Sequence, residues 1–467
     1  MVFSSMTFIP LFLPIVLILY YLFRNLQMRN AILLIFSLLF YAWGEPKFIL
    51  VMLLTVTVNY LCSLLMDRLE KPSTRTVTMA AGVILSLGFL TYFKYFGFFS
   101  DVVMDILGKE NPFTKPVLPI GISFYTFQVL TYTVDVYRGK VPVQKSFSKL
   151  LLYVSFFPQL IAGPIVNYTD IAASLDKRQS SVEDVYQGFL RFFAGFGKKV
   201  LLANTCGIIT DKLTAADTMS FAGSWLMILA YAFQIYFDFS GYSDMAIGMG
   251  QMFGFKFLEN FNYPYISRSI TEFWRRWHIS LGSFFREYVY IPLGGNRVCL
   301  WKKIRNIMVV WLLTGFWHGA SWNFLVWGLY YGLLLLAEKF LFQNIQQKMP
   351  VILNWALTFV LVLIGWVFFY YEKLGDGLFH IGIMFGIVKT SLTDPTAIYY
   401  FKHYLLFLVA AVLACIPWKV VIDRLPCKKT VEQLNLLLKP LILTALFLLG
   451  MATIITQSYN PFLYFRF

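Results

Sequence analysis

The sequence predicts an all-α protein that crosses a membrane many times. Of its 467 residues, 58% are hydrophobic and 13% are charged, and the mean hydropathy is +0.66. A water-soluble domain carries roughly a quarter charged residues, so that class is excluded. Hydrophobic runs of about 20 residues, the length that spans a bilayer, recur along the chain. Between about 150 and 300 these runs become short and are interrupted by Gly, Pro and charged residues.

The charge and cysteine content exclude further classes. The chain has 39 Lys and Arg against 24 Asp and Glu, a formal net charge of +15. In a membrane protein this excess is expected beside anionic headgroups, so we predict contact with membrane lipids and none with nucleic acid. No cysteines have C-x-x-C spacing, so neither a metal site nor a disulfide framework is predicted. The five cysteines are Cys62, Cys206, Cys299, Cys415 and Cys427.

The loops between the first spans predict the orientation of the chain. Spans are expected at 7–24, 30–44, 47–66, 76–99 and 117–135. The loops after the first, third and fifth span hold nine basic residues: Arg24, Arg29, Arg68, Lys71, Arg75, Arg138, Lys140, Lys145 and Lys149. The opposite loops hold Lys47, Lys109 and Lys115. The positive-inside rule therefore places the N-terminus outside the cytoplasm.

Two central segments have a composition that disrupts a regular span. The stretch 156–164 is apolar, but Pro158 and Pro164 forbid an unbroken helix. It is expected to be either an interfacial loop or a re-entrant segment that lines a cavity. The stretch 188–202 predicts a basic helix at the membrane interface. Its basic residues are Arg191, Lys198 and Lys199.

Two carboxylates, Asp238 and Asp244, lie toward the end of a long helix predicted from Phe221. Charge at that depth is costly unless it faces a cavity or finds a partner. The commoner role is structural, with Arg275 or Arg276 as the cation that links neighbouring helices. A direct part in a reaction is the alternative.

An amphipathic helix is predicted over 271–288. Ser269 or Thr271 can cap its N-terminus. Its apolar and aromatic residues recur at one-, three- and four-residue steps, which places Trp side chains at headgroup level. Arg275 and Arg276 would ordinarily contact lipid phosphates.

Histidine is rare, with four in the chain, and one lies where a polar ring is unexpected. His318 lies deep in the apolar run 304–340, where an imidazole without a partner costs on the order of a few kcal/mol. Small residues leave space around it, and Trp317 and Trp322 are expected to line that space. We therefore predict His318 as a general base, with a structural, hydrogen-bonded histidine as the alternative. The small residues are Gly315, Gly319, Ala320 and Ser321.

The other three histidines are expected to have structural or interfacial roles. His278 lies at the edge of the amphipathic helix, where a packing role is the default. His380 and His403 lie near span ends and are expected at the membrane interface.

At these motifs the sequence resembles the membrane-bound O-acyltransferase (MBOAT) family. The similarity is greatest to the bacterial branch that includes the membrane subunit of alginate O-acetylation. The motifs follow the family's order along most of the chain. They are Met1–Ser5, Phe40–Gly44, Pro119–Gln128, Phe156–Ile165, Tyr236–Asp244, Phe261–Tyr265, Trp274–His278, Tyr290–Arg297 and Phe316–Ala320. One position departs, because Trp366–Phe369 is followed by Tyr370 where this branch usually has Arg.

The resemblance implies a fold in which a ring of about 10–12 transmembrane helices surrounds a thin centre of short, tilted and re-entrant helices. The whole chain, 1–467, is expected to form this one domain. Its parts are the N-terminal spans at 1–135, the central region at 136–300, the hairpin with His318 at 301–345, and the C-terminal spans at 346–467.

The resemblance also implies acyl transfer from a thioester to a hydroxyl, with His318 and His278 as the catalytic pair. The expected donor is acetyl-CoA, as a substrate, with no tightly bound cofactor. The expected acceptor is a cell-surface or secreted polysaccharide, reached with an esterase-like or transferase partner outside the cytoplasm. The expected location is the plasma membrane.

The residues expected to bind substrate or acyl donor lie in the same motifs. They are Tyr236, Asp238, Ser240, Asp244, Asn262, Tyr265, Trp274, Arg275, Arg276, Trp277, Trp317, Ser321, Trp322 and Asn323. Among them, Trp317, Ser321 and Asn323 are candidate donors to a thioester oxyanion. Arg275 and Arg276 are candidates for the phosphates of coenzyme A.

Three alternatives remain open from the sequence. His318 could carry the acyl group itself instead of acting as a general base. The same fold could transfer D-alanyl groups to teichoic acid. A proton-coupled transporter, with His318 and Asp238 as a relay, is the third, although no inverted repeat is evident.

Overall fold

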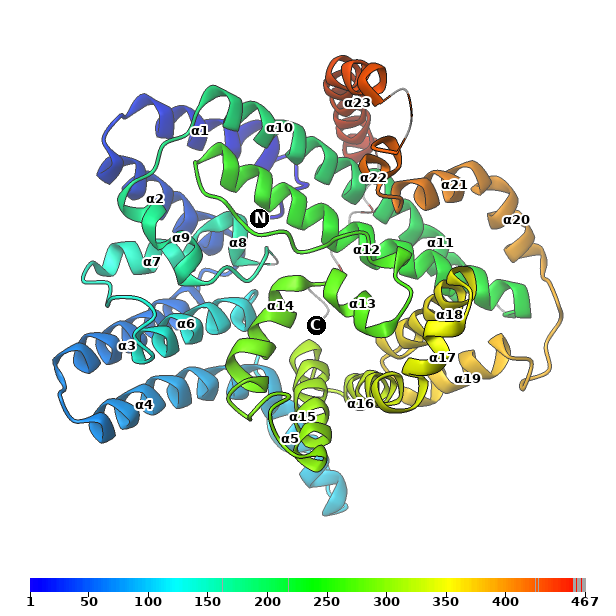
Figure 1. Ribbon diagram of the computed structural model, residues 1–467, viewed down its shortest axis with the longest axis horizontal. Helices are drawn as coiled ribbons and strands as arrows, with labels where there is room; N and C mark the ends of the chain where they lie inside the picture. The colour runs from blue at the N-terminus through cyan, green and yellow to red at the C-terminus, as the bar shows by residue number, and fades with distance from the viewer. Residues whose placement is uncertain are drawn as a thin grey trace. The chain divides into compact units, whose positions relative to one another are not determined.

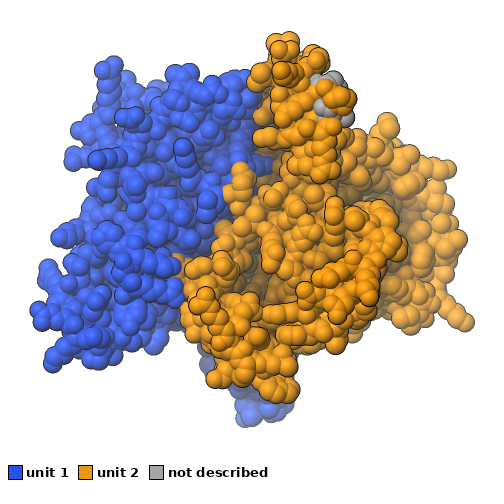
Figure 2. Space-filling view, viewed as in Figure 1, with its two compact units in different colours: residues 1–192, 242–258 blue, residues 193–241, 259–467 orange. Residues whose placement is uncertain are grey.

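The computed structural model describes residues 1–161, 163–216, 218–424, 426, 428–456, 459 and 463. These residues form helices and no strand, which confirms the all-α class. The chain divides into two compact units, which are described separately (Figure 2). Unit 1 comprises 1–192 and 242–258, and unit 2 comprises 193–241 and 259–467.

Unit 1 contains the early spans. Its helices are η1 (Phe8–Phe12), α1 (Leu13–Leu22), α2 (Leu26–Gly44), α3 (Ile49–Arg68), α4 (Pro72–Leu90), η2 (Thr91–Tyr95), α5 (Phe96–Ile106), α6 (Ile122–Tyr137), α7 (Phe147–Ser155), α8 (Phe157–Leu160) and α9 (Tyr168–Asp176). Two helices, α10 (Val182–Gly197) and α12 (Phe221–Met252), contribute residues to both units. Each of the five predicted early spans overlaps one or more of these helices.

Unit 2 contains the remaining helices. They are η3 (Lys198–Ala203), α11 (Asn204–Thr214), η4 (Pro264–Ile266), α13 (Ile270–Arg276), α14 (Ile279–Phe285), η5 (Arg286–Tyr290), α15 (Leu300–His318), α16 (Trp322–Ala337), η6 (Glu338–Phe342), α17 (Gln343–Lys348), α18 (Val351–Tyr370), α19 (Leu374–Met384), α20 (Pro395–His403), α21 (Leu405–Ala414), α22 (Trp418–Ile422) and α23 (Lys428–Thr456).

Seven helical stretches within the described residues are long and apolar enough to cross a membrane, or eight if the pair α20 and α21, bent by 62°, counts as one span. They are 26–44, 49–68, 72–106, 182–214, 322–348, 351–370 and 428–456. This is fewer than the expected ten to twelve, because several apolar helices are short. In addition, α12 and α15 are long enough to cross a membrane, but they are not among the stretches apolar enough to do so.

Buried hydrogen bonds tie the helices of unit 1 together. Helices α3, α4 and α6 pack side by side (Figure 1). At their centre the Asn59 amide donates to Ser86 Oγ at 2.6 Å, and Thr133 Oγ1 donates to Asn59 Oδ1 at 2.8 Å. Because such groups have no water to bond in a bilayer, they add specificity to helix packing.

The stretch 156–164 is a buried, broken segment. Helix α7 ends at Ser155, and α8 is a single turn whose residues are all buried. Phe156 and Phe157 are at most 1% exposed, and the Phe157 N–H donates to Ser37 Oγ at 3.1 Å. Protein therefore covers the broken backbone of the described part, as a re-entrant segment requires, and Ala162 lies outside the described residues.

The stretch 188–202 was predicted as an interfacial helix, and it lies within the helical stretch 182–214, which is long and apolar enough to cross a membrane. Two of its three basic residues pair with carboxylates. Arg191 pairs with Asp244 at 2.8 Å in unit 1, and Lys199 pairs with Asp238 at 2.7 Å in unit 2. The prediction that Arg275 or Arg276 pairs with these two carboxylates was therefore wrong.

The cysteines within the described residues are free thiols: Cys62, Cys206, Cys299 and Cys415. Cys427 lies outside the described residues.

The buried ion pair of Lys199 and Asp238 leads to a stability prediction. Both side chains are 3% exposed, and Lys199 also donates to Asn204 Oδ1 at 3.0 Å. We expect Lys199→Met to lower the free energy of unfolding by about 3–5 kcal/mol, because a buried carboxylate loses its cation. Thermal unfolding of the detergent-purified protein measures this.

Two further variants test the cause of that loss. Adding Asp238→Leu to Lys199→Met should recover most of the stability, because the unpaired charge is removed as well. Lys428→Met, which breaks an exposed pair with Asp423, should leave the midpoint unchanged. An equal loss in Lys199→Met and Lys428→Met would contradict the buried-charge explanation.

Candidate active site

His278 lies in a break between two short helices of unit 2. The predicted amphipathic helix over 271–288 is divided into α13 and α14, with Trp277 and His278 between them. His278 has φ 45° and ψ 55°, a left-handed conformation that non-glycine residues rarely adopt. The predicted cap at Ser269 is present, since its Oγ accepts the Glu272 N–H at 3.0 Å. The periodicity failed to predict the break because both halves share an apolar face.

Asn260 holds the backbone and the ring at this break. Its carbonyl oxygen accepts the Ile279 N–H at 2.9 Å. Its side-chain Oδ1 accepts the Ser280 N–H at 3.2 Å and the Ser280 hydroxyl at 2.9 Å. The same Oδ1 lies 3.1 Å from His278 Nδ1. Asn260 is 1% exposed and His278 is 2% exposed, so these bonds are shielded from water.

His318 is the last residue of α15 and is enclosed by aromatic rings. Its imidazole centroid lies 5.0 Å from that of Trp327 and 5.1 Å from that of Phe369, both edge-on. The side chain is 4% exposed. Rings therefore fill much of the space that the neighbouring small residues were expected to leave open.

The small residues near His318 allow helices α15 and α16 to cross closely. A Cβ added to Gly315 would lie 2.2 Å from the Phe324 carbonyl oxygen and 3.1 Å from Gly328 Cα. The two backbones thus touch through glycines, as is typical of tightly packed membrane helices. This contact places the end of α15, and with it His318, against Trp327 of α16.

The two histidines share one aromatic neighbour. The Trp317 indole is 5.8 Å from the His278 ring and 5.0 Å from the His318 ring, between centroids. All three side chains are at least 96% buried. The structure therefore brings together two residues that lie 40 positions apart, one from the break after α13 and one from the end of α15.

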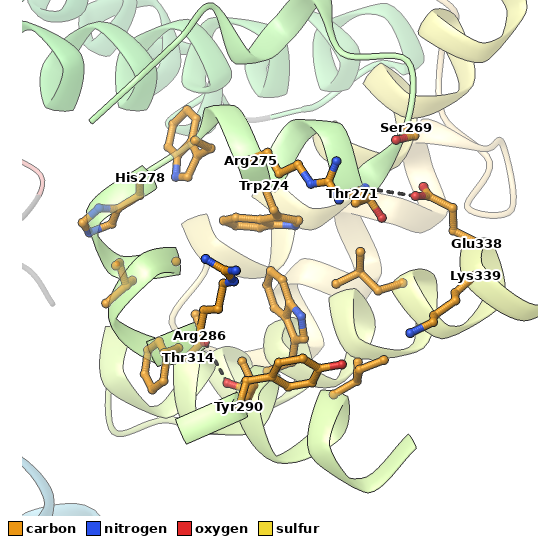
Figure 3. A pocket seen from close by; sticks show the side chains of 18 of the residues that line it. Ser269, Thr271, Trp274, Arg275, His278, Arg286, Tyr290, Thr314, Glu338 and Lys339 are labelled. Atoms are coloured by element: carbon orange, nitrogen blue, oxygen red, sulfur yellow. Dashed lines mark hydrogen bonds between the residues drawn. The ribbon is translucent and has the colours of Figure 1, made fainter. Parts of the chain in front are cut away.

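Unit 2 contains a cavity of about 830 Å³, and His278 is one of the residues that line it. Figure 3 shows His278, Trp274 and Arg275 around this space, together with Arg286 and Lys339. Side chains from α13, α14 and η5 line it, as do side chains from α15 to α17. His318 is not among the lining residues, but Thr314, one helical turn earlier on α15, is.

The cavity wall carries more positive than negative charge. Its cations are Arg275, Arg286 and Lys339, and its one carboxylate is Glu338. Both Glu338 oxygens accept backbone N–H groups at the start of α13, from Ile270 at 2.7 Å and Thr271 at 3.2 Å. The acid therefore stabilises a helix N-terminus and leaves the cations available to an anion.

The three cations differ in how far they are already engaged. Lys339 donates to Asn296 Oδ1 at 2.8 Å, and the exposed Arg286 has a 3.4 Å contact with Glu287. Arg275 makes no hydrogen bond or ion pair to any residue that the structure describes. It is the cation best placed to take an anionic ligand.

Several predicted binding residues instead form an aromatic core beside the cavity. Tyr236, Tyr265 and Trp277 are 3–6% exposed and pack on one another. The Tyr265 hydroxyl donates to the Ala232 carbonyl at 2.6 Å. Of these three, Trp277 also lines the cavity. Trp274, which lines it too, packs against Trp311 at 4.7 Å between centroids.

Other predicted binding residues have structural contacts. Asp238 and Asp244 are in the ion pairs described above, and Ser240 is buried in α12. Arg276 pairs with Glu272 at 2.9 Å. Its Nη1 donates to the Asn262 carbonyl at 3.0 Å, and the Asn262 N–H donates to the Arg276 carbonyl at 2.9 Å.

The candidates after His318 lie at the start of α16. Ser321 is the N-cap of that helix, and Trp322 is 58% exposed. The Asn323 amide nitrogen donates to the Tyr371 carbonyl. One of the two N–H donors of the Asn323 amide is therefore already engaged.

Residues 136–372 match the membrane-bound O-acyltransferase family. The chain is 44% identical over 382 residues to a protein of Pseudomonas aeruginosa named probable alginate O-acetylase, a match that covers 80% of this chain and 73% of the relative. The chain belongs to the membrane-bound O-acyltransferase family. It is therefore an integral membrane O-acyltransferase, as the motifs predicted.

Two further members of the family differ in the group or polymer that their names give. The peptidoglycan O-acetyltransferase of Helicobacter pylori is 34% identical, over 84% of this chain and 81% of its own. The teichoic acid D-alanyltransferase of Bacillus subtilis is 30% identical, over 57% of this chain and 74% of its own.

The structure shows what occupies the position where this chain departs from its branch of the family. Tyr370 packs edge-on against Tyr231, and its hydroxyl lies 3.0 Å from Thr214 Oγ1. A hydroxyl pair between α18 and α11 thus occupies the position where the resemblance led us to expect an Arg.

Sequence reasoning missed Asn260, Arg286 and Lys339. Asn260 precedes a motif that was recognised, but its contact with His278 joins residues 18 positions apart. Arg286 and Lys339 resemble ordinary interfacial charges, and no sequence signal separates them from other basic residues. Among the described residues, no three His, Cys, Asp or Glu side chains form a group that could hold a metal.

The glycine contact between α15 and α16 predicts a substitution that acts at a distance. In this acyltransferase Gly315→Ala should separate the two helices and displace His318, which would lower kcat tenfold or more and stability by about 1–3 kcal/mol. A transferase assay on membranes, normalised to the amount of folded protein, measures the first effect. Gly375→Ala, at a glycine with no neighbour within 4 Å, is the control. Full activity in Gly315→Ala would show that the crossing does not position His318.

Proposed function

We propose that the protein moves an acetyl group from a cytoplasmic acetyl thioester, acetyl-CoA, across the plasma membrane for O-acetylation of a cell-surface or secreted polysaccharide. The observation that carries the proposal is that two buried histidines, His278 and His318, both pack against the Trp317 ring. His278 also borders a cavity with excess positive charge. A cationic cavity bordered by an imidazole base suits an anionic acyl donor.

Acetyl is favoured over D-alanyl as the transferred group by the pattern of relatives. The alginate O-acetylase relative matches 80% of this chain at 44% identity, whereas the D-alanyltransferase relative matches 57% at 30%. D-alanyl transfer to teichoic acid is the second candidate. Membership of an acyltransferase family leaves no reason to propose a transporter.

The charge distribution of the α15–α16 hairpin supports a cytoplasmic mouth for the cavity. Lys302, Lys303 and Arg305 lie near the start of α15. Lys339 and Lys348 lie past the end of α16, and the opposite connection, 319–321, carries no charge. By the positive-inside rule the basic end faces the cytoplasm, where coenzyme A is made available. The same rule applied to the early loops places the N-terminus outside.

The donor would lie with its phosphates on the cations and its thioester toward the histidines. Arg275, Arg286 and Lys339 supply the positive charge. Thr314 marks the far wall, about 6 Å along the helix axis from His318.

The transfer itself needs one proton acceptor. As the acceptor hydroxyl oxygen bonds to the thioester carbonyl carbon, its proton passes to an imidazole nitrogen of His318. The carbon–sulfur bond then breaks, and the thiolate takes a proton to leave as a thiol. In the alternative route the His318 nitrogen attacks first and carries the acetyl group to the hydroxyl. His278 lines the donor cavity and would contact the thioester end.

We also propose an extracytoplasmic partner protein, esterase-like or a transferase, that passes the acetyl group to the polymer. The support for it is the similarity to the polysaccharide-acetylating branch of the family.

The proposal predicts that transfer depends on both site histidines. His318→Ala should reduce transfer from radiolabelled acetyl-CoA to background, and His278→Ala should reduce it by about 100-fold or more, because general acid–base catalysis supplies about 10²–10⁴-fold. Membranes with each variant, prepared so that they retain the other envelope proteins, are incubated with label and polysaccharide acceptor. His403→Ala, at an exposed histidine, is the matched control and should be fully active.

The same assay separates the two candidate donors. Transfer of label from acetyl-CoA, and none from a D-alanyl carrier protein, supports the proposal. Transfer from the carrier protein alone supports the second candidate. Full transfer by His318→Ala would remove that residue from the mechanism under either donor.

The cavity cations predict a change in donor affinity. Arg275→Glu should raise the KM for acetyl-CoA about tenfold or more with kcat little changed, because one charge-assisted hydrogen bond to a phosphate is lost and a like charge is introduced. Steady-state kinetics on membranes measures both constants. Lys348→Glu, an exposed charge reversal that does not line the cavity, should leave KM unchanged. A KM shift of the same size in both variants would indicate general electrostatic attraction instead of a donor site.

A further inference from the structure

We propose that Asn260 is a positioning residue that fixes the tautomer of His278, so that Nδ1 carries the proton and Nε2 carries the lone pair. The inference rests on the proposed function, in which His278 takes part in acyl transfer. It assigns a role to a residue that touches the histidine and does not line the cavity.

The orientation of the Asn260 amide is fixed by a donor that cannot reverse. The Ser280 backbone N–H can only donate, and it points at Asn260 Oδ1 at 3.2 Å. The Ser280 hydroxyl, 2.9 Å from the same atom, adds a second donor. The amide therefore presents its oxygen, not its nitrogen, to this turn.

That oxygen determines which nitrogen of His278 is protonated. Asn260 Oδ1 lies 3.1 Å from His278 Nδ1, and an amide oxygen is only an acceptor. A lone pair on Nδ1 at that distance would face the lone pairs of the oxygen, so the Nδ1–H tautomer is the bonded one. The neutral ring then has its basic lone pair on Nε2, away from Asn260.

Asn260 also stabilises the backbone at His278 through its carbonyl oxygen. His278 adopts a left-handed conformation that costs on the order of 1–3 kcal/mol for a non-glycine residue. The Asn260 carbonyl accepts the next N–H, from Ile279, at 2.9 Å. One residue thus holds both the strained turn and the ring orientation, which keeps the imidazole on the cavity wall.

Aromatic rings pack against His278, and charged groups lie in the cavity that it borders. The ring packs edge-on against Phe239 of α12 at 4.7 Å and against Trp317 of α15 at 5.8 Å, between centroids. The charged groups of the cavity that it borders are Arg275, Arg286, Lys339 and Glu338, and His318 is the other titratable ring on Trp317. A carboxylate at residue 260 would place a negative charge at the position of Asn260 Oδ1, which lies 3.1 Å from His278 Nδ1.

The decisive experiment is the pH profile of acetyl transfer by Asn260→Asp. The carboxylate keeps the acceptor for Nδ1–H but stabilises the imidazolium. The pH of half-maximal kcat on the acid side should therefore rise by about one unit or more. Asn260→Leu, which has a similar shape and no acceptor, should lower kcat about tenfold or more with the KM for acetyl-CoA within about twofold. A purely structural role would change the amount of folded protein but not the position of the acid limb.

A matched control and a direct measurement separate the possible failures. Asn344→Asp, the same change at an exposed amide of α17, should leave the pH profile at its wild-type position. An unshifted acid limb in Asn260→Asp would overturn the inference. If wild type transfers no acetyl group from acetyl-CoA, or if His278→Ala transfers at the full rate, the proposed function fails instead.

The tautomer can also be read without any assay of activity. With four histidines in the chain, ¹⁵N-histidine spectra of the full-length protein in detergent are tractable, and a His278→Gln spectrum assigns the ring. We expect the protonated nitrogen to be Nδ1. A protonated Nε2 in the neutral ring would overturn the inference even if the Asn260→Asp protein does not fold.

Discussion

The cost of leaving a polar group unpaired away from water shapes this protein. A charge in a bilayer or a dry protein interior is tolerated only beside a partner, and the described structure follows that rule. Lys199 binds Asp238 and Asn204, and Arg191 binds Asp244. These pairs allow the stretch 182–214 to be a candidate span in spite of its charges. In unit 1 the same constraint joins α3, α4 and α6 through hydrogen bonds of Asn59.

The site is built where regular helix is interrupted or compressed. Two short helices meet at His278, whose left-handed backbone is stabilised by Asn260. Two longer helices cross so closely at Gly315 and Gly328 that no side chain fits between their backbones. The first feature places one imidazole on a cavity wall, and the second places the other among rings. Because Trp317 contacts both, a shift of either element would alter their spacing.

The cavity and the two histidines differ in what they contribute to the site: the cavity wall carries cations, and the histidines are buried imidazoles. Cations line the cavity on the side of the basic hairpin end, and the carboxylate among them is engaged by backbone N–H groups. An anionic donor can therefore bind without approaching an uncompensated negative charge. Aromatic rings surround His318, and its side chain is 4% exposed, so the imidazole is shielded from water.

The sequence by itself determined the membrane class and the family, and it singled out His318 as a candidate. These follow from composition, from motif order and from the rarity of histidine in an apolar chain, all of which are local properties. It did not determine which of the other motif residues border the cavity. Trp274, Arg275 and Trp277 do, whereas Asp238, Asp244 and Arg276 are held in ion pairs.

Only the tertiary structure decided those partners, because they come from segments far apart in the chain. It also decided the break at His278, since the apolar periodicity continues through α13 and α14 while Asn260, 18 residues earlier, forms the bonds that stabilise the turn. Periodicity reports which face of a helix is buried. It does not report the hydrogen bonds by which a distant residue ends that helix and orients a ring.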